Sequence, residues 1–125
     1  VQPAEYITAT DANGVSRTAL CVYSIGNFLT QHRSQYTDSG IVFEFTLAEQ
    51  ADGTIAVTAP GYVPVYVWTF KNTAGADDYR VLPTGVYMNN RPDGMSDEQY
   101  NRMRETWNET TSLMGGDAVL RTLTD

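Results

Sequence analysis

The sequence has 125 residues, of which 42% are hydrophobic and 11% aromatic. This length and composition suit one packed domain and argue against a disordered chain. Fifteen acidic and eight basic side chains give a formal net charge of −7. An acidic surface repels phosphate backbones, so nucleic acid is not expected as a partner. Anionic membranes and polyanionic polymers are disfavoured for the same reason.

The counts of cysteine and histidine exclude further classes. Cys21 and His32 are single residues of their kinds, so the chain has neither an intrachain disulfide nor the ligands of a structural zinc site. Cys21 lies in an apolar run and is interpreted as a small buried hydrophobic residue rather than a reactive thiol. No run approaches the ~20 apolar residues of a membrane span, and no signal peptide is visible. The start on Val1-Gln2-Pro3, without methionine, suits either a processed N-terminus or an excised fragment.

The first part of the chain predicts a β-hairpin followed by a polar loop. Residues 5–10 and 17–24 are predicted strands, joined by a turn at Asn13-Gly14, because both turn residues tolerate positive φ. The second strand is continuously apolar over residues 19–23, which predicts burial on both of its faces.

A second hairpin is predicted next. Residues 40–48 alternate between apolar and polar side chains, which is typical of a half-buried strand whose inner face carries Ile41, Phe43, Phe45 and Leu47. Ala51-Asp52-Gly53 is predicted to form a turn, and residues 54–59 are predicted to return beside this strand. Pro60-Gly61 is predicted to turn the chain again.

Residues 62–70 are the most β-prone segment, and residues 79–82 form a short final strand. Pro64 cannot donate a ladder hydrogen bond, so it marks an edge or a bulge. The aromatic side chains at period two can form either a carbohydrate-stacking face or a packed sheet face, and the packed face is favoured. They are Tyr62, Tyr66, Trp68 and Phe70.

The pattern then becomes helical. Ser96 and Gln99 have the spacing of a capping box, and apolar residues follow at helical spacing up to Met114. Gly115-Gly116 is predicted to end this helix, and Asp117 to cap a last short helix over residues 118–124.

We therefore expect a mainly β, α+β structure. Its body, residues 1–95, is predicted to be an antiparallel sheet or small sandwich of about five to seven strands. Residues 96–125 are predicted to form a helical tail that packs on this body.

Groups with the spacing of a catalytic site are scarce. A two-metal hydrolase needs several histidines and carboxylates at one site, whereas His32 is alone and is best interpreted as an exposed loop residue. Ser24 precedes a glycine at a strand end but lacks the glycine pattern of a nucleophile elbow. Gly26 can let a ligand approach the backbone or simply form a sharp turn, and the turn is favoured.

One segment carries a family resemblance. Val22-Tyr23-Ser24-Ile25-Gly26-Asn27-Phe28 resembles the Tyr-Ser-Leu-Gly-Asn-Phe signature of CapA-type capsule (poly-γ-glutamate) biosynthesis proteins, with isoleucine in place of leucine. Val1-Gln2-Pro3-Ala4-Glu5 resembles the Val-Gln-Pro-x-Glu run that precedes this signature by one hairpin. The segments at Asp38-Ser39-Gly40 and Tyr79-Arg80-Val81-Leu82-Pro83 also resemble parts of the family. The resemblance covers roughly the first two-thirds of the chain.

This family is similar to calcineurin-like metallophosphoesterases, which have two packed sheets flanked by helices and a two-metal site. The resemblance implies that the chain is a piece of such a fold and starts just after the last metal ligand. No catalytic residue, metal ligand or cofactor is then expected in this chain, and a divalent metal such as manganese belongs to the upstream part of the parent protein. The resemblance would place five residues near the parent's site, as substrate-proximal contacts or structural anchors: Gln2, Glu5, Ser24, Gly26 and Asn27.

Three functions from different classes follow. The favoured one is a non-catalytic C-terminal portion of a capsule-synthesis protein at the bacterial cell surface, which contacts the upstream part of its parent or membrane components of the synthesis assembly. The second is an autonomous glycan or cell-wall binding module that uses the aromatic face. The third, an enzyme acting with this chain alone, is least favoured, although the full-length parent can be a metal-dependent hydrolase. If this chain held a metal site of its own, the first residues to test would be His32, Glu5 and Asp38.

A sheet separated from its neighbours exposes an edge and an apolar face. We therefore expect either self-association of the chain or a helix over residues 96–114 that folds across the exposed face.

Overall fold

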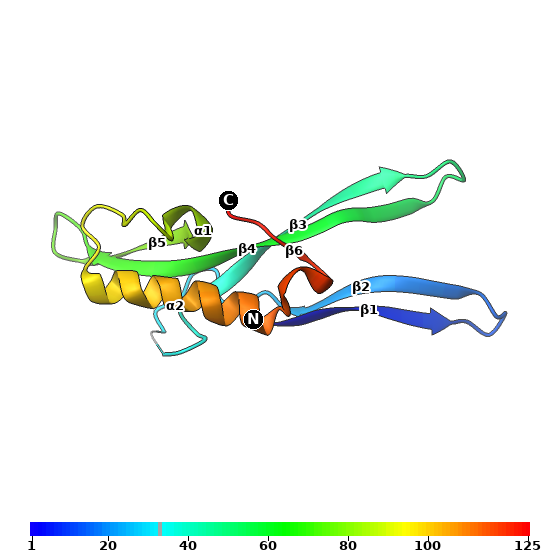
Figure 1. Ribbon diagram of the computed structural model, residues 1–125, viewed down its shortest axis with the longest axis horizontal. Helices are drawn as coiled ribbons and strands as arrows, with labels where there is room; N and C mark the ends of the chain where they lie inside the picture. Colours follow the sequence, from blue (N-terminus) through cyan, green and yellow to red (C-terminus); the bar gives the residue numbers. More distant parts are fainter. Residues whose placement is uncertain (33) are drawn as a thin grey trace.

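The computed structural model describes residues 1–32 and 34–125, and their fold is mainly β with one long helix (Figure 1). In chain order the elements are β1 (Gln2–Thr10), β2 (Ser16–Ser24), β3 (Ser39–Glu49), β4 (Ile55–Lys71), β5 (Asp77–Pro83), α1 (Thr84–Tyr87), α2 (Asp97–Leu113), a 3-10 turn η1 (Gly116–Ala118) and β6 (Arg121–Thr122). β1 and β2 form one antiparallel sheet, while β3, β4 and β5 form a second in that order. The predicted mainly β, α+β class is confirmed.

The predicted hairpins and the predicted helix are also confirmed. Asp11 accepts hydrogen bonds from the backbone around the first turn, and Asp52 does so at the second turn. Ser96 and Gln99 exchange the two hydrogen bonds of a capping box at the start of α2. Gly115 and Gly116 have φ of 75° and 66°, a left-handed conformation that ends the helix.

Helix α2 covers one face of the second sheet. The side chain of Met103, on this helix, is fully buried in a cluster with Tyr66, Trp68, Leu82 and Met95. The indole N–H of Trp68 donates to the side chain of Gln99 at 3.1 Å, which ties the first turn of the helix to the C-terminal part of β4. The expectation that this helix folds across the exposed sheet face is confirmed.

A second cluster joins the two sheets. Ala4 of the first sheet packs with Ile41 and Tyr62 of the second, and Met114 and Leu120 close the cluster from the C-terminal segment. Because this cluster lies at the base of both hairpins, it fixes them to the body at one end only.

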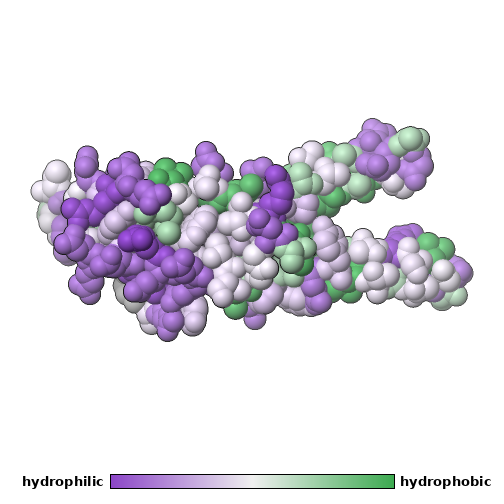
Figure 2. Space-filling model, viewed as in Figure 1, coloured by the Kyte–Doolittle hydropathy of each residue, from purple (hydrophilic) through white to green (hydrophobic). Residues whose placement is uncertain are grey.

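Beyond that base the two hairpins project as separate arms (Figure 1). The first arm is the β1–β2 hairpin, and the second arm is the outer part of the β3–β4 hairpin, residues 42–59. Figure 2 shows the open space between the arms and apolar atoms on both of them. Two predictions of burial are therefore wrong. Residues 19–23 are half-buried or exposed, and Phe45 and Leu47 are 45% and 63% exposed.

The chain does not turn at Pro60-Gly61. Strand β4 continues through both residues, with a register shift opposite them between Glu44 and Thr46 and a φ of 50° at Ala59. Antiparallel pairing with β3 on both sides of this irregularity holds β4 as one strand, so the proline and glycine bend it without reversing it.

The predicted last helix at 118–124 is also wrong. The segment instead forms β6, which pairs in parallel with Gly61 and Tyr62 of β4. The carboxylate of Asp117 accepts from the backbone N–H of Thr122 at 2.8 Å, so it stabilises the approach to a strand rather than the start of a helix.

Pro64 shows how the far edge of β4 is completed. β5 pairs with β4 from Val65 onward and β6 pairs with it at Gly61 and Tyr62, so Pro64 lies in the gap between these two strands. Because neither strand pairs with β4 at Pro64, the missing N–H of the proline removes no ladder hydrogen bond on that side. The carbonyl of Pro64 accepts from the hydroxyl of Thr84 at 3.0 Å, and Thr84 is fully buried at the start of α1.

This bond yields a stability prediction. Replacing Thr84→Val keeps the side-chain shape but leaves the buried carbonyl of Pro64 without a donor, so we expect a loss of about 1–3 kcal/mol in the free energy of unfolding. Urea denaturation followed by tryptophan fluorescence measures it. Thr84→Ser retains the hydroxyl and serves as the control. A valine variant as stable as the serine variant would show that the hydrogen bond contributes little.

Candidate functional site

The predicted site residues gather where the two arms meet. Gln2 and Ser24 are cross-strand partners at the base of the first arm, and Gly26 and Asn27 follow directly. The backbone N–H of Asn27 donates to the carbonyl of Ser39 at 3.1 Å, and its side-chain amide donates to the carbonyl of Thr37 at 2.8 Å. Both bonds of Asn27 therefore tie the segment after β2 to the start of β3 and to the loop before it, which is the role of a structural anchor.

Gly26 and Gly40 allow the two arms to approach closely at this junction. They form an isolated antiparallel bridge, and Ile41 donates a backbone hydrogen bond to Ile25 at 2.8 Å. A Cβ atom on Gly26 would lie 2.8 Å from the side chain of Val1 and 3.0 Å from the Cα atom of Gly40, and Gly26 has a φ of +73°. The glycine in the signature-like segment is therefore explained by packing, and no ligand is needed to account for it.

The junction can be tested with two glycines of similar conformation. Gly14, in the open turn at the tip of the first arm, has a φ of +79°, and a Cβ atom added to it would meet no other atom within 4 Å. Alanine at either position carries the same left-handed strain, but only Gly26→Ala also crowds the junction. We expect Gly26→Ala to destabilise the protein by about 1–3 kcal/mol more than Gly14→Ala. Thermal unfolding followed by circular dichroism compares the two variants, and equal losses would contradict a close-packed junction.

Glu5 lies apart from this junction on the exposed surface of β1. Its carboxylate accepts a hydrogen bond from the hydroxyl of Tyr23, and this bond together with the carboxylate charge raises the pKa of Tyr23 above its ordinary value. The two residues line a shallow hollow of about 390 Å³ with Gln2, Pro3 and Ala4. Glu5 and Tyr23 are the titratable side chains that line this hollow, and a catalytic site needs further acids, bases or metal ligands beside them.

His32 and Asp38, the other candidates for a metal site, do not join Glu5. The side chain of His32 is exposed in the loop before β3, and Asp38 is buried against α2. Within residues 1–32 and 34–125, no group of three or more His, Cys, Asp or Glu side chains could hold a metal ion. The residues present therefore do not fit a two-metal centre, and we derive no reaction step through one.

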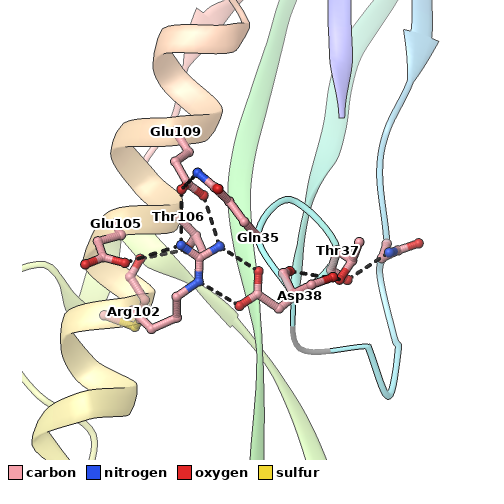
Figure 3. A network of polar contacts seen from close by, with 10 residues as sticks. Gln35, Thr37, Asp38, Arg102, Glu105, Thr106 and Glu109 are labelled. Atoms are coloured by element: carbon pink, nitrogen blue, oxygen red, sulfur yellow. Dashed lines mark hydrogen bonds and ion pairs between the residues drawn. The ribbon is translucent and has the colours of Figure 1, made fainter.

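Asp38 instead forms the main polar contact between the loop and the helix (Figure 3). Both of its oxygens accept from the guanidinium of Arg102 at 2.9 Å, and Asp38 is only 1% exposed. Arg102 also donates to Glu109 and Glu105, and Gln35 donates to Glu109 at 2.8 Å. The Asp38 and Glu109 hydrogen bonds raise the pKa of Arg102 further above its ordinary value despite partial burial.

Glu109 is the second carboxylate of this network. Burial alone would raise its pKa, but the hydrogen bonds from Arg102 and Gln35 and the Arg102 charge together hold the pKa below its ordinary value. Glu109 is therefore ionised at neutral pH, and the network is a set of charged partners that are all satisfied. Such a network fixes structure and leaves no group available for proton transfer.

Removing Arg102 tests this interpretation. In Arg102→Met the carboxylate of Asp38 keeps its burial and loses its partner, so we expect a loss of about 3–5 kcal/mol. The control is Arg104→Met, two residues along the same helix, where the guanidinium is exposed and lies over the ring of Tyr100. Denaturation with guanidinium chloride measures the free energy of unfolding of both variants. Similar small losses in the two variants would mean that the Asp38–Arg102 pair is no more than a surface contact.

The largest hollow bordered by both arms is apolar. This inter-arm cleft, of about 660 Å³, is lined by Tyr6, Thr18, Ala19, Leu20, Phe43, Phe45, Ile55, Ala56 and Val57. The first four residues come from the first arm and the remainder from β3 and β4. The sequence analysis predicted burial for four of these residues, Ala19, Leu20, Phe43 and Phe45, and only the divergence of the arms reveals that they line a cleft.

The predicted aromatic face is not exposed. Tyr62, Tyr66 and Trp68 are all at least 96% buried, the first under the C-terminal segment and the other two under α2. The packed interpretation is thus confirmed. The guanidinium of Arg80 lies over the rings of Trp68 and Phe70, at 5.7 Å and 5.3 Å from their centroids, and so adds to the packing of these two rings.

No protein-family model, curated protein or solved structure matches this chain. The resemblance to CapA-type proteins therefore stays a prediction. In the described part of the chain, neither helix combines the length and the apolar character that crossing a bilayer requires.

Proposed function

We propose that this chain is a non-catalytic C-terminal portion of a CapA-type capsule (poly-γ-glutamate) biosynthesis protein, in which it completes the fold or contacts a partner. The observation that supports this proposal is the inter-arm cleft. Its two walls are apolar, and no other segment of the described chain fills the space between them.

Two features of the arms argue that something covers them in the functioning protein. A two-stranded hairpin is marginal by itself in water, and each arm extends well beyond the clusters that bury its base. Large apolar side chains such as Tyr6, Ile55 and Val57 are about half exposed or more, at 53%, 61% and 47%. Contiguous apolar surface of this kind typically marks an interaction site.

The non-catalytic role is supported by the polar groups. The side-chain amide N–H of Asn27 and both carboxylate oxygens of Asp38 form bonds between structural elements, and Ser24 accepts from the backbone of Gly26 at 3.3 Å. In the proposal, the metal ligands of the parent protein lie upstream of Val1, and a metal such as manganese would bind there. The parent would then act at the bacterial cell surface, with membrane components of the synthesis assembly as further partners.

An autonomous glycan-binding module is the alternative. It would use aromatic rings as a stacking platform, but Trp68 is 4% exposed and its indole N–H is bonded to Gln99. A sugar could reach this ring only if α2 were displaced, which would open the cluster that buries Tyr66, Trp68 and Met103. No observation favours this alternative over the first proposal.

Two measurements test the proposal. Calorimetric titration of the chain with Mn²⁺ is expected to give no binding heat, because the described residues offer no cluster of ligands. Tight stoichiometric binding would contradict the proposed placement of the metal site. The coding sequence immediately upstream of Val1 is expected to encode the family's Asp, Asn-His and late histidine motifs in order. An upstream sequence without them would remove the basis for a CapA-type parent.

A further inference from the structure

We propose that the inter-arm cleft binds one extended peptide segment, with apolar side chains on one face and lysine or arginine on the other. This deepens the proposed function, on which it rests, by stating the chemistry of the contact. Three independent observations lead to it: the apolar walls of the cleft, the unpaired backbone edges of β2 and β3, and the net acidic charge of the two arms.

The walls provide the apolar half of the recognition. Tyr6 and Leu20 line one side, and Phe45, Ile55 and Val57 line the other. The rings of Phe43 and Phe45 contact each other with centroids 5.1 Å apart, which makes a continuous aromatic surface on the second arm. A segment entering between the arms would contact apolar side chains from both sides.

The backbone edges of the arms provide hydrogen-bonding groups for an added segment. β2 pairs with β1 and β3 pairs with β4, and the two pairs meet only at the Gly26–Gly40 bridge and the hydrogen bonds beside it. Beyond this bridge the arms diverge (Figure 1), so the outer parts of β2 and of β3 each keep one edge without a strand partner in the described chain. A strand edge with unpaired N–H and C=O groups binds extended segments by strand addition. Alternate side chains of an added strand point the same way, so one face can be apolar and the other basic.

Charge selects the partner. Residues 42–59 hold three carboxylates, Glu44, Glu49 and Asp52, and no lysine or arginine. The first arm adds Glu5 and Asp11 against Arg17, so both arms are net acidic. A second copy of this chain would bring its own acidic arms against these arms, whereas a basic segment is attracted to them.

The test uses the whole chain and a defined probe. The probe is a fluorescein-labelled peptide of about seven residues that alternates lysine and valine, a length that matches a typical strand. Fluorescence anisotropy is expected to show saturable binding to the chain. A lysine–serine peptide of equal charge and a glutamate–valine peptide of equal apolarity are both expected to bind at least about tenfold more weakly, because each lacks one half of the recognition.

Two valines of similar exposure on the second arm provide a matched pair of variants. Val57 is 47% exposed and lines the cleft, while Val42 is 41% exposed and lies outside it. Val57→Ser is expected to weaken binding of the lysine–valine peptide about tenfold and Val42→Ser to leave it unchanged. The charge reversal Glu49→Lys is expected to weaken binding of this peptide and to strengthen binding of the glutamate–valine peptide.

Three results would overturn the inference. Equal affinity for the lysine–valine and lysine–serine peptides would show charge attraction alone. Equal effects of the two valine variants would place the peptide outside the cleft. A dimer in sedimentation that Val57→Ser dissociates, with no peptide binding, would identify a second copy as the occupant. None of these results bears on Mn²⁺ binding or the upstream motifs, so failure of this inference is distinguishable from failure of the proposed function.

Discussion

The arrangement of the molecule depends on the length of β4 relative to the helix that covers it. At the rise of an extended strand, the 17 residues of β4 span about 55 Å, whereas the 17 residues of α2 span about 26 Å. The helix can therefore cover only part of the strand. From Gly61 to Trp68 every residue of β4 is buried, while from Ile55 to Pro60 none is. The projecting second arm is the uncovered remainder of the same strand.

The first arm depends in turn on the glycines at its base. Gly26 and Gly40 bring β2 against β3 at one point, and the cluster of Ala4, Ile41 and Tyr62 buries that point. Asn27 bonds across the same junction. All of these contacts lie near one end of the first arm, so nothing holds its outer part beside the second arm. An open cleft between the arms is the direct consequence.

Local sequence signals were sufficient for most elements and insufficient for burial. The Asn-Gly and Asp-Gly turns, the Ser96 capping box and the Gly115-Gly116 stop each act through neighbouring residues, and each appears where it was predicted. Pro60-Gly61 failed as a turn because pairing with β3 on both sides holds β4 extended. The strand β6 was missed because two residues pairing in parallel across 60 positions leave no local periodicity.

The inter-arm cleft was missed for a related reason. Alternating apolar residues such as Phe43 and Phe45 indicate that one face of a strand avoids water, but they do not say which segment covers that face. Here the covering segment is absent over the outer half of the arm, so residues predicted for a core line a cleft. Conversely, the polar residues of the signature-like segment were weighed as contacts to a ligand or as anchors, and Asn27 serves as an anchor. The ion pair of Asp38 with Arg102 joins residues 64 positions apart, a separation that no local pattern reveals.

The charge of the chain limits what the proposed role in capsule synthesis can be. Poly-γ-glutamate is a polyanion, and a chain of net charge −7 with two acidic arms would repel it. Direct handling of the polymer therefore belongs to another part of the proposed parent protein. Acidic arms with apolar inner walls suit a protein surface of opposite charge, where burial of Phe45 and Val57 supplies affinity and the carboxylates select the partner. On physical grounds, the proposed piece is better suited to assembly with other polypeptide segments than to contact with the polymer.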